Sequence, residues 1–482
     1  TYTVRWDVAC CNVYRIVQRG EDPASNACWG RRRWWPMEVP AAENARQKIG
    51  LPGATAVVVG NMVGVGVFTS LGFQLLGISS GFSLIFLWLL GGVYSLMGAL
   101  CYAELASALP RSGGEYHLLS RTFHPAAGFA AGWLSSTVGF AAPVALAAMA
   151  FGSYLGSVLG WGAAGQAGLS ALMIISVTAC HLRDVAFGNR FQLAATSLKV
   201  GLVAGLAVCG FVLGKNQGVS FLPVEDSLRE ILSGGFAVSF YFVSFSYSGW
   251  NAAAYIVGEV RDPQRSVPRA LLAGTALVTV LYVLLNAAFL YSTPAAEMAG
   301  QKEVGLIAAR SIFGESGGNF TGILISIGLV SAVSAMTWAG PRVGQAMGED
   351  YRALRFLARR TRRGIPVTAI LIQSAIALLL ALTGKFEAVL SYIEFSLVLS
   401  LAATVAGLIW LRWRQPEVAR AAQFRCPWFP LVPLLFIILS LYISVRALER
   451  QPVESLWGLA TLAAGVVVYF LVGGRGGGEN FR

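Results

Sequence analysis

Two short segments combine small residues in a way that could bind a small molecule carrying both charges. The first, 60–68, contains two glycines one residue apart, Gly64 and Gly66. The second, 245–251, places serine, glycine and asparagine within an aromatic run. Glycine lowers helix stability by about 1 kcal/mol relative to alanine, so each segment is predicted to interrupt a helix. Free amides at the start of a half-helix suit an anion, and freed carbonyls suit a cation.

The ligand that this chemistry predicts is a zwitterion, with its carboxylate on one segment and its ammonium on the other. Close helix packing is the alternative, because Gly60 and Gly64 have the spacing of small residues at helix contacts in membranes. The matching break in the second segment favours a binding site. Irregular backbone at membrane depth is tolerated where it lines a cavity, and paired interruptions mark such sites.

Lys199 is a third candidate for function. It lies about nine residues into an apolar helix predicted over 190–213, which is roughly 14 Å at 1.5 Å per residue. That depth is close to the middle of a hydrocarbon core about 30 Å thick. A charge there is costly and indicates function by default. Two roles stay open, a static tether and a group that releases a proton during a cycle, and the tether is favoured.

Four further residues are candidates for gates. Glu394, inside an apolar stretch, could read a cationic ligand, form an external gate or be a structural carboxylate. Glu104 and Glu259 lie at helix ends and could close an inner gate or anchor the topology. Trp338 could flank the pocket or simply pack. The basic residues expected to accompany the two glutamates are Arg111, Arg261 and Arg265.

Other functional classes lack their sequence signals. A membrane enzyme would need a nucleophile–base pair or a metal cluster at depth, but the three histidines are scattered and close to loops. Channels display filter loops or charged rings, which are not visible. A receptor would need a sizeable soluble domain. We therefore predict no catalytic residue, no metal and no cofactor.

The elements that must position these residues are long apolar helices. Of the 482 residues, 56% are hydrophobic and only 12% are charged, whereas soluble proteins carry about 25% charge. A spanning helix needs about 20 apolar residues. That window predicts twelve spans, at 51–77, 82–108, 126–156, 166–182, 190–213, 233–258, 268–293, 319–348, 365–383, 387–411, 429–448 and 453–473.

The remaining segments define the domain organisation. Residues 50–473 are predicted to form one transmembrane domain, with a short surface helix over 303–313. Residues 1–49 are expected to be a cytoplasmic tail that is disordered or, upstream of Met37, mis-assigned. Residues 474–482 are a second cytoplasmic tail. Most of the 36 lysines and arginines fall on the side that holds both tails, which predicts that side to be the cytoplasm. The net charge of +12 is then a topology signal, and no nucleic acid is expected.

Four motifs follow one another along the predicted transmembrane domain. They are Gly64-Val65-Gly66-Val67-Phe68, Cys101-Tyr102-Ala103-Glu104-Leu105 with 110–116, Tyr247-Ser248-Gly249-Trp250-Asn251 with 258–270, and Gly340-Pro341-Arg342-Val343. Together they resemble the amino acid–polyamine–organocation (APC) superfamily, above all its L-type and bacterial amino-acid permeases.

The resemblance implies an all-α membrane protein with the LeuT-type architecture. This consists of two inverted five-helix repeats, with helices 1 and 6 broken, plus two extra helices. It implies a secondary transporter of the cell membrane that takes up or exchanges amino acids independently of sodium. Neutral amino acids are favoured, and a cationic amino acid or a polyamine is the alternative.

The resemblance also assigns roles to residues of the first two candidate segments. The backbone around Val65 and Gly66, with Val63 and Gly64 beside it, would bind the substrate carboxylate. Many relatives have serine where this chain has Val65, so a backbone contact survives there but a hydroxyl contact does not. In the second segment, the carbonyls of Phe245 and Ser248 would contact the substrate ammonium, and Phe245 would also act as a gate. Asn251 would link the two broken helices or reach the substrate.

Lys199 would take the place where sodium-coupled relatives bind a cation. It would then tether helix 1 to Ser331 or Ser334 of helix 8. The expected partners are an amino-acid substrate and the lipid bilayer. Because the loop between the third and fourth predicted spans contains no cysteine, we expect no disulfide-linked accessory subunit.

Overall fold

The structure is a computed structural model that describes residues 49–183, 186–223, 226–361 and 364–473. Within these ranges the chain is helical, and its only β-type pairing is an isolated bridge between Ile49 and Val260. Ten helical spans of the described chain, some of them made of two consecutive helices, are long and apolar enough to cross a membrane. The all-α prediction is confirmed, whereas the count of twelve spans is not. The predictions for the two tails, Met37 included, lie outside the described residues.

Both predicted interruptions are present. The first span consists of α2 (Leu51–Met62) and α3 (Gly66–Gln74), separated by three non-helical residues. The sixth span is helical only as α11 (Gly234–Tyr247), which ends in a turn followed by two 3-10 turns, η3 (Ala252–Tyr255) and η4 (Val257–Glu259). The main chain therefore loses its regular pairing at corresponding places in the two halves.

The other long helices follow the predicted spans, and several short helices lie between those spans. Before α11 they are α4 (Gly81–Ala108), α5 (Gly114–Thr122), α6 (Pro125–Leu134), α7 (Ala141–Leu159), α8 (Ala163–Arg183), α9 (Ala186–Leu213) and α10 (Ser227–Ile231), with a π-helical turn at Ser135–Gly139. After α11 they are α12 (Pro263–Ser292), α13 (Ala295–Met298), α14 (Val304–Ala339), α15 (Pro341–Asp350), η5 (Arg352–Leu354), α16 (Arg355–Ala358), α17 (Val367–Leu382), α18 (Phe386–Arg414), α19 (Pro416–Ala421), α20 (Leu431–Arg450) and α21 (Pro452–Gly473).

Two of these helices differ from the prediction in an informative way. The expected surface helix 303–313 forms the first part of α14 and is set off from the rest by Gly314, whose φ of 76° breaks the helical path. The helix α17 has only 16 residues. At 1.5 Å per residue it is about 24 Å long, which is short for a hydrocarbon core of about 30 Å.

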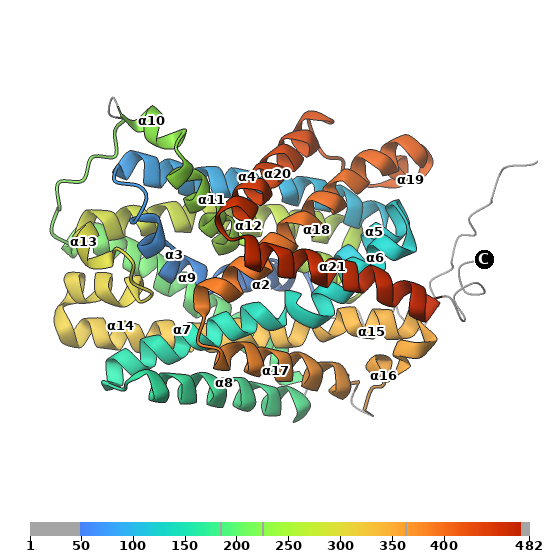
Figure 1. Cartoon of the computed structure of the whole chain (residues 1–482), viewed down its shortest axis with the longest axis horizontal. Helices are drawn as coiled ribbons and strands as arrows, with labels where there is room; N and C mark the ends of the chain where they lie inside the picture. The colour runs from blue at the N-terminus through green and yellow to red at the C-terminus, as the bar shows by residue number, and fades with distance from the viewer. Residues whose placement is uncertain (1–48, 184–185, 224–225, 362–363, 474–482) are drawn as a thin grey trace, which may run out of the picture. The chain divides into compact units, whose positions relative to one another are not determined.

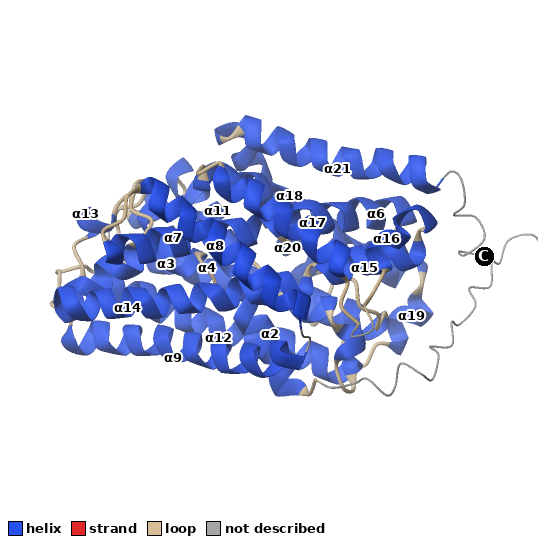
Figure 2. Cartoon of the chain, turned by 90° about the horizontal axis from the view of Figure 1, so that it is seen from below, coloured by secondary structure: helices blue, strands red, loops and turns tan. Residues whose placement is uncertain are grey.

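Packing places the broken helices in the middle of the bundle. The helix α12 packs along α4, α2 and α9, and α14 packs along α7, α8 and α9. These long helices run side by side in Figures 1 and 2, while α21 lies at the margin of the bundle in Figure 2. The helix α3 contacts α11, and every residue of the stretch 57–74 is buried. The two interruptions therefore meet away from the lipid-facing surface.

Candidate binding site between the two broken helices

The two interrupted segments touch each other at two glycines. A Cβ atom added to Gly66 would lie 2.5 Å from the Cα atom of Ser246. A Cβ atom on Gly249, whose φ is +96°, would lie 3.0 Å from the carbonyl carbon of Asn61. Side chains cannot occupy either place, so glycine is what allows the two backbones to approach this closely. The Ser70 and Ser246 hydroxyls, 2.7 Å apart, join the same two helices.

The interruptions leave opposite polar groups unpaired at this contact. Within the described chain, the amides of Val65, Gly66 and Val67 donate no hydrogen bond, and they are the first amides of the half-helix α3. The carbonyls of the turn that ends α11, namely those of Ser246, Tyr247 and Ser248, accept no hydrogen bond from the residues that the structure describes. Buried backbone groups are normally paired. The arrangement therefore offers donors for an anion on one side and acceptors for a cation on the other.

The space beside the first break differs from that at the helix contact. A Cβ atom on Gly64 would meet only the carbonyl oxygens of Met62 and Asn61, at 3.8 and 3.9 Å. These atoms belong to the same segment, so no neighbouring element crowds Gly64. Its amide turns back to the Met62 carbonyl at 2.8 Å. Other elements therefore leave room beside Gly64.

Lys199 donates a hydrogen bond to a carbonyl that the bend leaves without its helical donor. In a regular helix the Gly64 amide would donate to the Gly60 carbonyl, but it donates to Met62 instead. The Lys199 ammonium donates to Gly60 at 3.0 Å, and its side chain is buried, with an exposed fraction of 2%. The lysine therefore replaces the missing helical donor and holds the end of α2 to α9.

The expected second bond of Lys199, to helix α14, is not formed. The Ser334 hydroxyl lies 2.9 Å from the Nε2 atom of His181 instead. The buried Ser331 hydroxyl has no hydrogen-bond partner in the described chain. The lysine stem nevertheless passes along α14, because a Cβ atom on Gly328, one turn before Ser331, would lie 3.5 Å from the Cγ atom of Lys199. The contact to α14 thus consists of packing.

An aromatic cluster supports the break from the opposite side. The Tyr282 hydroxyl donates to the Met62 carbonyl at 2.6 Å. The ring of Tyr282 packs edge-on against Trp88 and lies 5.0 Å from the ring of Tyr247. The Tyr247 hydroxyl donates to the Trp88 carbonyl at 2.9 Å. Sequence reasoning missed this cluster, because nothing local distinguishes these aromatic residues from ordinary packing.

Comparison with known proteins agrees with this geometry. A sequence profile of the family described as "Amino acid permease" matches residues 49–472. The chain belongs to the amino acid permease family. It is therefore a membrane transporter and not an enzyme, and the predicted kinship with APC permeases is confirmed.

Several named relatives align with most of this permease. The human large neutral amino acids transporter small subunit 2 is 28% identical over 434 residues, which cover 88% of this chain and 80% of the relative. The mouse b(0,+)-type amino acid transporter 1 is 26% identical over 433 residues, 88% of each chain. The mouse Asc-type amino acid transporter 1 is 25% identical over 437 residues, 88% of this chain and 81% of the relative. Because the human relative is named a small subunit, the comparison does not support the expected absence of an accessory subunit.

Glu115 is the main functional candidate that sequence reasoning missed in the permease. This buried carboxylate, on α5, accepts hydrogen bonds from Tyr102 at 2.7 Å, from Asn251 at 2.6 Å and from Tyr255. It therefore gathers α4 and the irregular segment after α11 around one charge. Asn251, expected to link the broken helices or to reach substrate, is held by Glu115. The motif around Glu115 was recognised, but a role for its carboxylate depends on partners distant in sequence.

Two of the predicted gate residues meet through a third residue, Arg342. The carboxylate of Glu259, directly after the irregular segment, pairs with Arg342 at 2.5 and 3.2 Å. The same guanidinium lies 3.9 Å from the ring centre of Trp338 and donates to its carbonyl. This contact joins the end of the sixth span to the junction of α14 and α15.

The partners expected for Glu104 and Glu259 are wrong in detail. Glu104 is fully buried and accepts two hydrogen bonds from Arg412 of α18, at 2.8 and 2.6 Å, and one from the Cys426 amide at 2.7 Å. Arg111 pairs with Asp350 at 3.0 Å, and the Arg265 Nε atom donates to the Gln423 amide oxygen at 2.9 Å. These partners differ from the expected ones because the tertiary fold places residues that are distant in the sequence next to the helix ends.

The remaining candidates, Phe245 and Glu394, lie on α11 and beside it. Glu394 of α18 is 2% exposed and lies beside Ser244 of α11. Phe245 follows directly and is buried at 4%, with its carbonyl accepting the Ser248 amide at 2.9 Å. The structure thus brings Glu394 to the broken helix, next to the buried Phe245.

Proposed function

We propose that this permease carries α-amino acids, preferentially neutral ones, by holding both charged ends on the two broken helices. The substrate carboxylate accepts hydrogen bonds from the Val65 and Gly66 amides, next to Val63 and Gly64. The ammonium is bound by carbonyls at the end of α11, at and beyond Phe245.

One observation carries this proposal. Unpaired amides and unpaired carbonyls lie on segments so close that the Gly66 Cβ position is 2.5 Å from Ser246. A helix N-terminus attracts anions and a helix C-terminus attracts cations. A free amino acid matches both groups at once, whereas a simple amine or acid matches one. The side chain of the substrate would then occupy the space that the backbone leaves beside Gly64.

Sodium independence follows from Lys199 in this proposal. The Lys199 ammonium already supplies a positive charge to the Gly60 carbonyl at 3.0 Å, so a metal cation there would meet electrostatic repulsion. Transport then proceeds by exchange or in a proton-linked manner. The orphan hydroxyl of Ser331 is the group that Lys199 would reach if α14 shifted, with Ser334 as the alternative.

The ion pairs described above would form the inner gate. Glu259–Arg342 and Arg111–Asp350 join separate elements at the end of the bundle that the basic loops assign to the cytoplasm. Breaking them would release the segment after α11, which is tied to Glu115 and to the start of α2. The proposed location is the cell membrane, with both termini in the cytoplasm.

A cationic amino acid or a polyamine is the second candidate substrate. Glu394 favours it, because its buried carboxylate lies on the broken helix through Ser244. A buried carboxylate without a basic partner could bind a cationic group at the far end of a substrate. The opposing observation is that the neighbouring Ser244 hydroxyl already gives this carboxylate a polar neighbour.

Exchange in proteoliposomes tests these proposals. The chain alone, reconstituted and preloaded with unlabelled alanine, should take up labelled alanine, and neutral amino acids should compete better than lysine, arginine or putrescine. A Glu394→Gln variant should leave this order unchanged if substrates are neutral. Preference for cationic competitors, lost in that variant, would establish the second candidate. Failure of every amino acid to compete would refute the substrate class, and activity only with a co-purified second protein would show that an accessory subunit is required.

A further inference from the structure

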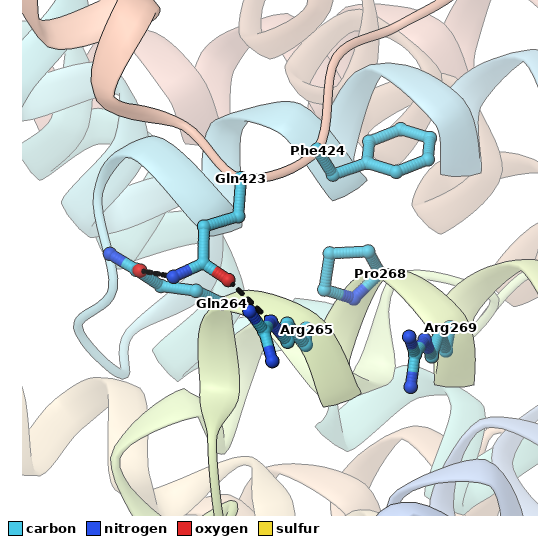
Figure 3. A pocket seen from close by; sticks show the side chains of 6 residues that line it. All are labelled: Gln264, Arg265, Pro268, Arg269, Gln423 and Phe424. Atoms are coloured by element: carbon cyan, nitrogen blue, oxygen red, sulfur yellow. Dashed lines mark hydrogen bonds between the residues drawn. The ribbon is translucent and has the colours of Figure 1, made fainter.

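A pocket of about 420 Å³ lies away from the broken helices, at the start of α12. Its six lining residues come from α12 and from the connection between α19 and α20. They are Gln264, Arg265, Pro268, Arg269, Gln423 and Phe424. Figure 3 shows Arg265 and Arg269 on the same side of α12, with the Gln423 side chain reaching across to that helix.

The charged groups of this pocket are two arginines without an acid among the lining residues. None of the six lining residues is acidic. The Arg265 Nε atom donates to the Gln423 amide oxygen at 2.9 Å, and the Gln423 amide donates in turn to Gln264 at 2.7 Å. Arg269 makes no hydrogen bond or ion pair with the described chain. Two guanidinium groups therefore present most of their N–H donors to an outside acceptor, and guanidinium forks match phosphate oxygens.

The pocket lies at the edge of the lipid-facing surface of α12. Residues 271–290 contain no charged residue, and a stretch of about 20 apolar residues fills the hydrocarbon core. Arg269 precedes this stretch by two residues, which places its head group at the level of lipid headgroups. The side chains of Leu277, Val280 and Leu284 are exposed by 42–57% and continue the face of Arg265 and Arg269 at helical spacing.

The second wall of the pocket also leads to lipid-facing side chains. Phe424 is followed within a few residues by α20, whose side chains Leu431, Leu434 and Ile438 are exposed by 44–59%. A ligand bound by the two arginines would thus lie next to the exposed apolar side chains of both α12 and α20. A free phosphate ester would leave that surface unused.

We propose that this pocket binds the phosphate of an anionic phospholipid, whose acyl chains extend along the exposed faces of α12 and α20. Arg265 and Arg269 bind the phosphate oxygens, and the amides of Gln264 and Gln423 contact the glycerol or headgroup hydroxyls. Pro268 and Phe424 pack against the glycerol backbone. The bound lipid would hold the start of α12, four residues after the gate residue Glu259.

Native mass spectrometry of the full chain with phosphatidylglycerol or phosphatidylcholine tests this assignment. The wild-type protein should retain one phosphatidylglycerol more firmly than any phosphatidylcholine. At about 1 kcal/mol per basic residue near a membrane surface, the double variant R265Q/R269Q should bind this lipid roughly thirty-fold more weakly. Normal amino-acid exchange by the variant in phosphatidylcholine vesicles would show that it is folded.

A matched control separates the pocket from general charge attraction. The variant R352Q/R355Q removes the same charge from two exposed arginines elsewhere and should retain the lipid as the wild-type protein does. Equal loss in both variants, or no loss in R265Q/R269Q, would overturn the proposal. Displacement of the lipid by millimolar glycerol phosphate would overturn the lipid as occupant, because a soluble phosphate ester would then suffice.

Discussion

Replacing Gly66 by alanine should force the two broken helices apart. The new Cβ atom would lie 2.5 Å from the Ser246 Cα atom, 2.7 Å from its Oγ atom and 2.8 Å from its Cβ atom. Carbon atoms pack best at about 3.5–4.0 Å, so the backbones must separate by about 1 Å. The Ser246 side chain cannot relieve this clash by rotating, because the nearest atom belongs to the main chain.

The magnitudes decide the sign of the effect. Overpacking of this kind costs about 1–3 kcal/mol, whereas alanine in a helix gains at most about 1 kcal/mol over glycine. Gly66→Ala should therefore lower stability on balance and disturb the amides and carbonyls that face each other. The same substitution at Gly64 should leave stability nearly unchanged. Apart from its two chain neighbours, the nearest atom to the new Cβ atom would be the Met62 carbonyl oxygen, at 3.8 Å.

Thermal unfolding and amino-acid exchange measure both consequences. We expect Gly66→Ala to melt at a lower temperature and to lose at least tenfold in exchange rate, and Gly64→Ala to melt like the wild-type protein. The double variant G66A/S246G should recover only part of the loss, because the clash with the main chain at position 246 remains. Wild-type melting and exchange in Gly66→Ala would refute the close approach of the two helices.

Further predictions concern the groups that hold the site and its inner end. Lys199→Ala leaves the Gly60 carbonyl unpaired, which should cost about 1–3 kcal/mol and abolish exchange; full exchange would contradict the tether. Glu115→Gln should lower the melting temperature and slow exchange at least tenfold, because an amide cannot accept from all three present donors, and unchanged rates would remove Glu115 from the site. Glu259→Gln breaks a partly exposed pair with Arg342, so the melting temperature should change little while access from the inner side increases, which labelling of engineered cysteines can show. Burial, together with the charges of Arg111 and Arg121, lowers the pKa of His117 on α5 to about 3. The contribution of neutral His117 to the free energy of unfolding should therefore be fully present above pH 6.5 and fall by about 1.4 kcal/mol per pH unit as the pH falls towards 3. His117→Gln should remove this slope from the pH dependence of the melting curves.

The sequence contained local signals for the breaks but not for their supports. Adjacent small residues predicted the interruptions at 63–65 and after Tyr247, because loss of helix propensity is a property of neighbouring residues. Burial of Lys199 followed from its position in an apolar stretch. By contrast, Glu104 and Arg412 are 308 residues apart, and no short-range pattern relates them.

The same limitation explains the missed carboxylate and the missed aromatic cluster. Glu115 is one acidic residue among several near helix ends, and only the fold brings three donors to it. Tyr282 lies in a helix with ordinary apolar periodicity, and its bond to the Met62 carbonyl exists because the first span is broken there. The resemblance to permeases supplied the order of the helices, while the contacts that stabilise the break required the structure.

Competition by substrate analogues that lack one charged end tests the central claim most directly. Labelled alanine exchange should be inhibited by alanine at low concentration, but at least a hundredfold less well by ethylamine, which lacks the carboxylate, and by propionate, which lacks the ammonium. This result is expected because the amides of α3 and the carbonyls of α11 each bind one end. Equal inhibition by alanine and by either analogue would show that the two broken helices do not hold a zwitterion.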